Sequence, residues 1–135
     1  MFDILDMGAS GLTAQRVRLD TIAGNIANIN TTHDASGKAN PYRRRFVILA
    51  PGQADNVDQP GVHVQDVKED TTDDFIKKFE PGNPDADQSG YVKYPNIDLS
   101  MEFVNALEAS RAYEANVTMI ETAKSMFNSN LRLLA

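Results

Sequence analysis

The sequence predicts an α+β protein in which two long terminal α-helices form an antiparallel coiled-coil-like pair and flank a small β-rich middle segment. The last forty residues contain no glycine and no proline, although the chain has eight glycines and six prolines. The first thirty residues carry a similar apolar repeat, whereas all six prolines and five glycines fall in residues 30–95. We therefore expect an N-terminal helix in 1–31, a middle segment in 32–95 and a C-terminal helix in 96–135, with both helices in one inner coiled-coil domain.

The N-terminal helix is predicted from residues that recur at alternating steps of three and four. This spacing keeps one face of a slightly underwound helix against a partner helix. Gly8, Gly11 and Gly24 each lower helix propensity by up to about 1 kcal/mol relative to alanine, so we expect neighbouring segments to order this helix. The repeat comprises Leu5, Gly8, Leu12, Gln15, Leu19, Ile22, Ile26 and Ile29.

The middle segment is predicted to contain short strands separated by turns. Prolines and glycines punctuate runs of β-forming residues here, a pattern typical of turns and strands. We expect strands at Tyr42–Leu49, Val62–Val67, Phe75–Phe79 and Tyr91–Tyr94, which together suffice for only a small sheet.

The C-terminal helix has a longer repeat and clearer boundaries. Pro95 prevents the helix from extending backward, and Asn96 or Asp98 can accept hydrogen bonds from its first free N–H groups. At about 1.5 Å per residue the helix is roughly 55 to 60 Å long, so it requires a surface to lie against. The repeat comprises Leu99, Phe103, Ala106, Ser110, Tyr113, Val117, Ile120, Lys124, Phe127, Leu131 and Leu134.

Composition argues against several classes of function. The net charge of −6 and the pI near 4.8 disfavour nucleic acids and anionic membranes as partners. The chain has no cysteine, so disulfides, thiolate metal sites and cysteine nucleophiles are excluded. The acidic start does not resemble a secretory signal, and no run reaches the eighteen apolar residues that a membrane span needs. We expect no membrane insertion, no small-molecule substrate and no cofactor.

Two features imitate metal sites. Asp85, Asp87, Ser89 and Gly90 match the beginning of a calcium loop, but Asn96 stands where such a loop requires a bidentate glutamate. A tight turn is the better interpretation. His33 and His63 have no second ligand at metal-binding spacing, so we expect ordinary polar contacts, no bound metal and no catalytic residue.

Alternatives remain for the basic cluster and for the apolar repeats. Arg43, Arg44 and Arg45 either form a solvated face or make salt bridges to an acidic partner, and with Arg111 they are candidates for polar contacts between subunits. The repeats form either a self-contained helical hairpin or surfaces shared with other subunits. Two amphipathic helices and a small sheet cover few apolar faces, which favours sharing.

Several motifs resemble those of bacterial flagellar rod and hook proteins. The N-terminal signature of that family is matched by Ala9–Arg16, Leu19–Asp20 and Asn25–Thr31. The proximal rod members are resembled at Pro41–Arg44, Gly61–Val62, Glu80–Asp87, Gly90–Lys93, Pro95–Asn96, Glu102, Val104–Asn105, Ala109–Tyr113, Ala115–Val117 and Lys124–Met126. Residues 32–40 and 66–74 fit less clearly.

The resemblance implies a structural subunit of the basal-body rod that spans the periplasm and transmits torque from motor to hook. It also implies export by the flagellar type III apparatus without a cleavable signal peptide. The partners would be other proximal rod subunits, the rod base adaptor, the distal rod and possibly further copies of the chain. The alternatives are a non-polymerising helical adaptor or export chaperone and a small secreted enzyme.

The residues expected to hold the assembly together share positions in the two apolar repeats. They are Leu5, Leu12, Leu19, Ile22, Ile26 and Ile29 in the N-terminal helix, and Phe103, Ala106, Tyr113, Val117, Ile120, Phe127 and Leu131 in the C-terminal helix.

Overall fold

The computed structural model describes residues 2–135 and confirms the predicted fold class. Helix α1 spans Phe2–Ala27 and helix α2 spans Leu99–Leu134. Between them lie β1 (Arg45–Pro51), β2 (Val62–Glu69), β3 (Ile76–Phe79) and β4 (Tyr91–Tyr94).

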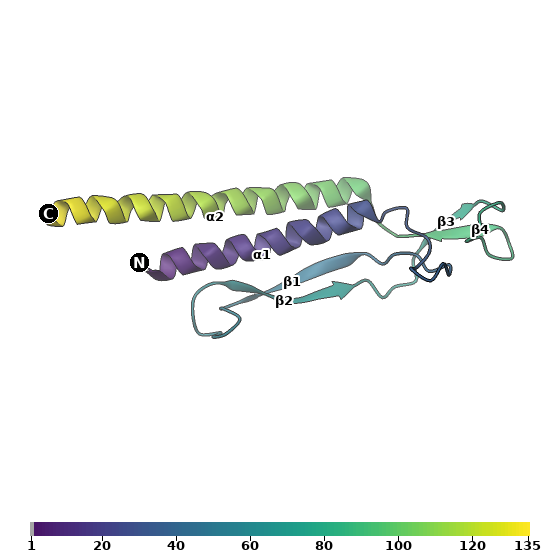
Figure 1. Cartoon of the computed structure of the whole chain (residues 1–135), viewed down its shortest axis with the longest axis horizontal. Coiled ribbons are helices and arrows are strands. Elements are labelled where there is room, and N and C mark those ends of the chain that lie inside the picture. The colour runs from purple at the N-terminus through teal and green to yellow at the C-terminus, as the bar shows by residue number, and fades with distance from the viewer. Residues whose placement is uncertain (1) are drawn as a thin grey trace.

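The molecule is a long rod rather than a sphere. Helix α1 runs antiparallel to α2 on one side and lies beside the β1–β2 hairpin on the other (Figure 1). Both chain ends lie near one end of the rod, and the β3–β4 hairpin forms the opposite tip. Because α2 has 36 residues and α1 has 26, the C-terminal part of α2 extends beyond α1.

The strands form two separate antiparallel hairpins instead of one small sheet. Hairpin β1–β2 pairs Arg45 with Glu69 and Pro51 with Val62, with a register shift after Ile48. Its first strand begins at Arg45 rather than at the predicted Tyr42, and before it Tyr42 bonds Asn25 on α1 while Arg44 bonds Glu102 on α2. Hairpin β3–β4 packs against neither helix over its length, and its fully buried Val92 contributes to a small core at the tip.

The start of α2 is defined by its N-cap. The carboxylate of Asp98 accepts hydrogen bonds from the backbone N–H groups of Ser100 at 2.9 Å and Met101 at 3.4 Å. Of the two predicted cap residues, Asp98 is therefore the one used, and it satisfies two donors that the helix itself cannot.

Small residues form much of the contact between the helices. Gly8 and Gly11 are buried on α1, and Ala109 and Ala123 are buried on α2. A Cβ atom on Gly8 would come within 2.6 Å of the Ile120 Cγ1 atom, so this glycine permits a close approach of α2. The glycines of α1 therefore lower helix propensity but allow close packing.

Substitution of Gly8 tests this account of the helix contact. We expect Gly8→Ala to lower the free energy of unfolding by about 1 kcal/mol, because the cost of overpacking exceeds the gain in helix propensity. Gly24→Ala is the matched control, since its added Cβ meets nothing closer than the Tyr42 hydroxyl oxygen at 3.8 Å and should stabilise the chain. Urea unfolding followed by circular dichroism measures both variants, and equal stabilisation by the two would contradict the account.

Candidate functional site

A buried polar network joins the end of α1, the start of α2 and the beginning of β1. The Glu102 side chain is 1% exposed, and one of its oxygens accepts a hydrogen bond from Arg44 Nε. The other oxygen accepts one from Asn25 Nδ2 at 3.3 Å. Since a buried carboxylate is costly unless paired and hydrogen-bonded, these contacts hold three distant segments of sequence together.

Asn25 continues the network to the backbone of β1. Its Nδ2 atom donates to the Arg45 carbonyl at 2.8 Å, and its Oδ1 atom accepts from the Arg45 N–H at 2.9 Å. The Tyr42 hydroxyl also donates to Oδ1, at 3.2 Å. Burial raises the pKa of Tyr42 more than Arg45 lowers it, which keeps the phenol protonated as a donor.

Sequence analysis did not predict this network. Asn25 and Glu102 were noted in the sequence only as parts of the family motifs. Glu102 lies outside the predicted apolar repeat, so no local pattern indicated that its side chain would be buried or which residues would pair with it.

The basic cluster is paired within the chain. Arg43 Nη2 lies 2.9 Å from Asp73 Oδ1, Arg44 pairs with Glu102, and Arg45 Nη2 lies 2.9 Å from Glu69 Oε1. Arg111 pairs with exposed Glu114 one turn further along α2. Because these pairs lie within one chain, they do not test the predicted polar contacts with other subunits, which stay a prediction.

Only some of the predicted repeat positions lie at the centre of the contact between α1 and α2: Gly8 and Ile22 are buried, and Ile120 lies against Gly8. On α2 the buried positions are Glu102, Ala109 and Ala123, and each is the residue directly before a repeat position. In an antiparallel pair of right-handed helices, the residue that follows a contact residue is rotated away from the partner helix. This rotation is toward the same side of the pair on both helices. The other repeat positions therefore form one strip, which we call the apolar flank.

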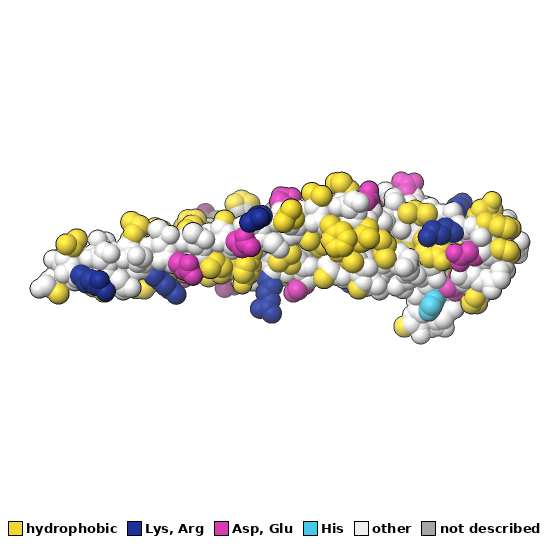
Figure 2. Space-filling view, turned by 90° about the horizontal axis from the view of Figure 1, so that it is seen from above, with side chains coloured by type: hydrophobic (Ala, Val, Ile, Leu, Met, Phe, Trp, Pro, Cys, Tyr) yellow, Lys and Arg dark blue, Asp and Glu magenta, His cyan; other side chains and the backbone are white. Residues whose placement is uncertain are grey.

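Much of the apolar flank is open to solvent. Phe103 is 58% exposed and Leu131 is 49% exposed. Leu5, Leu12, Leu19, Ile26, Ala106, Val117 and Ile120 are half-buried, Tyr113 and Phe127 are exposed, Ile22 is buried, and half-buried Ile29 lies in the turn after α1. Hydrophobic side chains are visible along the whole length of the molecule in Figure 2.

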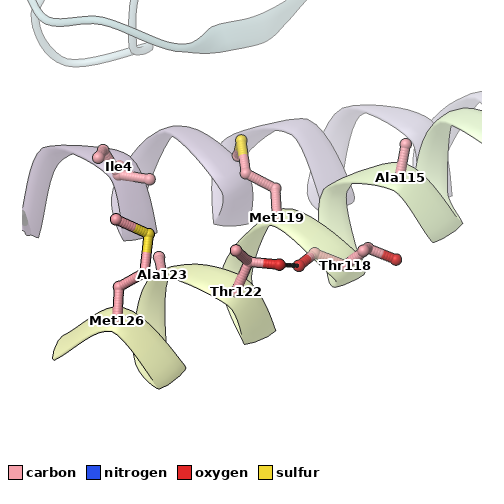
Figure 3. Close-up of a pocket in the computed structure, with 7 residues that line it drawn as sticks. All are labelled: Ile4, Ala115, Thr118, Met119, Thr122, Ala123 and Met126. Carbon is pink, nitrogen blue, oxygen red and sulfur yellow. Dashed lines mark hydrogen bonds between the residues drawn. The ribbon is translucent and has the colours of Figure 1, made fainter. Parts of the chain in front are cut away.

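An apolar groove lies where α2 passes the beginning of α1. It has a volume of about 420 Å³ and is bordered by Ile4 from α1 and by Met119 and Met126 from α2 (Figure 3). Ala115, Thr118, Thr122 and Ala123 complete its lining. Small side chains flanked by flexible methionines can accept a further helix, because both allow a close and adaptable contact.

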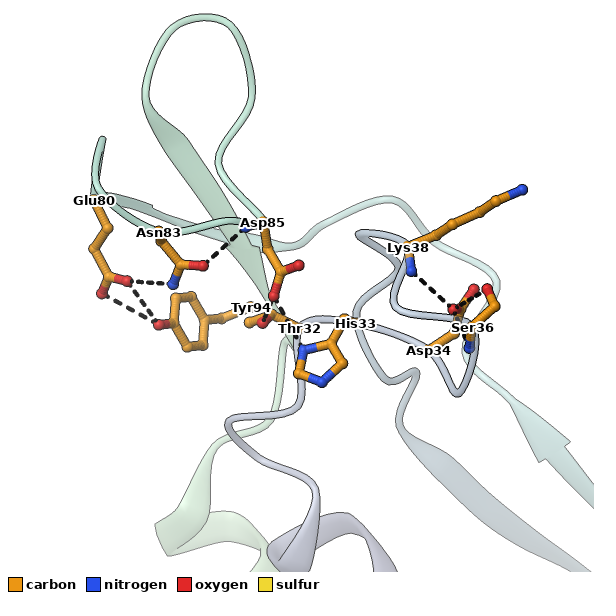
Figure 4. Close-up of polar contacts among 9 residues, drawn as sticks. All are labelled: Thr32, His33, Asp34, Ser36, Lys38, Glu80, Asn83, Asp85 and Tyr94. Atoms are coloured by element: carbon orange, nitrogen blue, oxygen red, sulfur yellow. Dashed lines mark hydrogen bonds and ion pairs between the residues drawn. The ribbon is translucent and has the colours of Figure 1, made fainter.

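The two metal-like features form polar contacts within the chain. Asp85 Oδ2 accepts a hydrogen bond from Thr32 Oγ1 at 2.6 Å and lies 3.1 Å from His33 Nδ1 (Figure 4). Asp87 accepts hydrogen bonds from the N–H groups of its own turn, and His63 Nδ1 lies 3.0 Å from the Gly52 carbonyl. Residues 2–135 contain no group of three or more histidines and carboxylates that could hold a metal ion. Neither helix in this range is long and apolar enough to cross a membrane.

The Asp85 contacts predict a pH dependence of stability. Hydrogen bonds from Thr32 and His33 hold the pKa of Asp85 below its usual value, so this group stabilises the fold above its unfolded pKa. That contribution is lost as the pH falls below about 4 and through the lower folded pKa. Asp85→Asn should flatten the fall in unfolding free energy over this range, measured by urea titrations at several pH values. Asp55→Asn, at an exposed loop carboxylate, is the control, and an unchanged slope for Asp85→Asn would contradict the assignment.

The sequence of the chain matches two protein families and several known proteins. Residues 5–32 match the family described as flagella basal body rod protein, and residues 88–133 match the family described as flagellar basal body rod FlgEFG protein C-terminal. The chain is 42% identical to the flagellar basal-body rod protein FlgC of Escherichia coli, over 98% of this chain and 97% of that protein. It is 39% identical to FlgC of Borreliella burgdorferi, over 99% and 97%, and 37% identical to FlgC of Bacillus subtilis, over 98% and 97%.

Proposed function

The chain belongs to the FlgC family of flagellar basal-body rod proteins and is a structural subunit of that rod, and we propose that it assembles by sharing its apolar flank with neighbouring subunits. Other components of the basal body are therefore its partners. The observation that carries the proposal is the exposure of large apolar side chains along α2 and at the start of α1.

The packing of α1 and α2 explains why this surface favours assembly. A self-contained helical hairpin would bury its largest apolar residues between the helices, whereas this pair places Gly8, Gly11, Ala109 and Ala123 there. Burial of apolar surface stabilises by about 25 cal/mol per Å². The large side chains on the flank and in the groove can gain this stabilisation only from another molecule.

Assembly of this kind suits a rod that transmits torque. A contact between different surfaces of identical or similar subunits extends into an open helical array when it does not close into a ring. We propose a tube in which the terminal helices form the inner layer and the middle segment contacts subunits further out. In line with the resemblance, its neighbours would be proximal rod proteins, the rod base adaptor and the distal rod, and the chain would be exported by the type III apparatus.

A charge placed in the apolar flank tests the proposal. Val117→Asp should abolish incorporation into rods and motility, because the interface would bury an unpaired carboxylate. Ser125→Asp introduces the same charge at an exposed position of α2 and should be better tolerated. Basal bodies isolated from cells that express each variant show incorporation, and swimming assays show motility. Motile cells carrying Val117→Asp would refute the proposal.

A further inference from the structure

We propose that a groove formed by α1, the beginning of β1 and α2 binds the acidic β1–β2 loop of a second copy of this chain. The inference rests on the proposed function, and it adds a specific polar contact to the sharing of apolar surfaces. We call this groove the arginine groove, since Arg18, Arg44 and Arg45 line it.

The arginine groove brings together cations from two distant parts of the sequence. It has a volume of about 240 Å³ and also includes Phe46 and Asn105 in its lining. Arg18 lies on α1, whereas Arg44 and Arg45 lie at the beginning of β1. The sequence repeat gave no indication that Arg18 would join the basic cluster.

Arg18 and Arg44 retain donors for an external carboxylate, and Arg45 bonds half-exposed Glu69 through Nε and Nη2 without using Nη1. Within residues 2–135, Arg44 donates a hydrogen bond only through Nε, to Glu102. Arg18 reaches Glu108 over 3.2 and 3.5 Å, and the Glu108 side chain is 64% exposed, so this pair is weakly held. A guanidinium has five N–H donors and prefers bidentate contacts with carboxylates. The groove can therefore accept another carboxylate without losing the buried Arg44–Glu102 pair.

The other candidate arginines are less suited to this role. Arg43 already bonds Asp73 and the carbonyl oxygens of Asp70 and Thr72, and its guanidinium lies 4.9 Å from the centre of the Phe75 ring. Arg111 lies on α2 beside Glu114. The structure thus narrows the predicted polar contacts to Arg44 and Arg45 and adds Arg18.

The β1–β2 loop has the chemistry that this groove requires. Asp55 and Asp58 are exposed and form no ion pair within the described part of the chain, and Val57 between them is 71% exposed. In the groove, Phe46 is 38% exposed beside the arginines. Two carboxylates around an apolar side chain therefore complement cations around an aromatic ring.

The positions of groove and loop fit a head-to-tail contact. The groove lies where β1 begins and the loop lies where β1 ends, about 20 Å away for a strand of this length (Figure 1). A second copy that lies beside the first and is displaced by about that distance along the long axis of the molecule can place its loop over the groove of its neighbour. Because the two surfaces differ, the contact does not close and can repeat.

Charge exchange in the bacterium that encodes the chain tests the pairing. Arg18→Glu and Asp58→Arg should each reduce rod incorporation about tenfold, the effect of losing roughly 1.4 kcal/mol of interaction. The double variant should restore incorporation because it recreates the pair with reversed charges. A reduction with Arg18→Glu that Asp58→Arg does not rescue would overturn the assignment of the second copy, and no effect of Arg18→Glu would overturn the groove itself.

Disulfide crosslinking tests the contact directly, because the natural chain has no cysteine. Co-expressed Asn105→Cys and Asp58→Cys variants should give a disulfide-linked dimer in isolated basal bodies. Ala23→Cys, on the exposed side of α1, should give none with Asp58→Cys. If Asn105→Cys and Asp58→Cys give no dimer although both of these variants enter the rod, the groove contact is refuted while the shared apolar flank stands. Failure of the wild-type chain to enter the rod would instead refute the proposed function.

Discussion

The buried pairing of Glu102 with Arg44 and Asn25 is the constraint on which the arrangement of this chain depends. The contact between α1 and α2 consists largely of glycine and alanine, which offer little apolar surface to bury. The polar network therefore does much to fix the position of the end of α1 relative to the start of α2. Removing one partner of a buried ion pair typically costs about 3–5 kcal/mol, so this junction resists displacement.

The same choice of residues connects fold and function. Small residues bring the helices close together and leave the large apolar residues outside, on the apolar flank and around the groove near Ile4 and Met126. In an isolated subunit, the apolar surfaces at the end of the molecule where both termini lie consequently have no packing partner. Neighbouring subunits in the basal body can supply the missing contacts, so that the order of the helices and the growth of the rod become coupled.

Local sequence patterns predicted the elements well because their determinants are local. The absence of glycine and proline after Pro95 predicted α2, and Asp98 was one of two predicted caps. The tertiary partners could not be predicted in the same way. Gly8 was placed in the N-terminal repeat and read as a weak helix former, but its close contact with Ile120 was not predicted, and Glu102 had no recognisable partner, because both contacts involve residues that are distant in the sequence. The proposed interfaces depend on other molecules and remain predictions.

Amide hydrogen exchange on the isolated chain and on purified rods tests the central claim most directly. The account predicts slow exchange around Asn25 and Glu102 in both samples, where the buried network protects the backbone. It predicts fast exchange near the start of α1 and the end of α2 in the isolated chain, with strong protection of both segments in the rod. Uniformly slow exchange along both helices of the isolated chain would contradict the claim that the apolar surfaces are completed by other subunits.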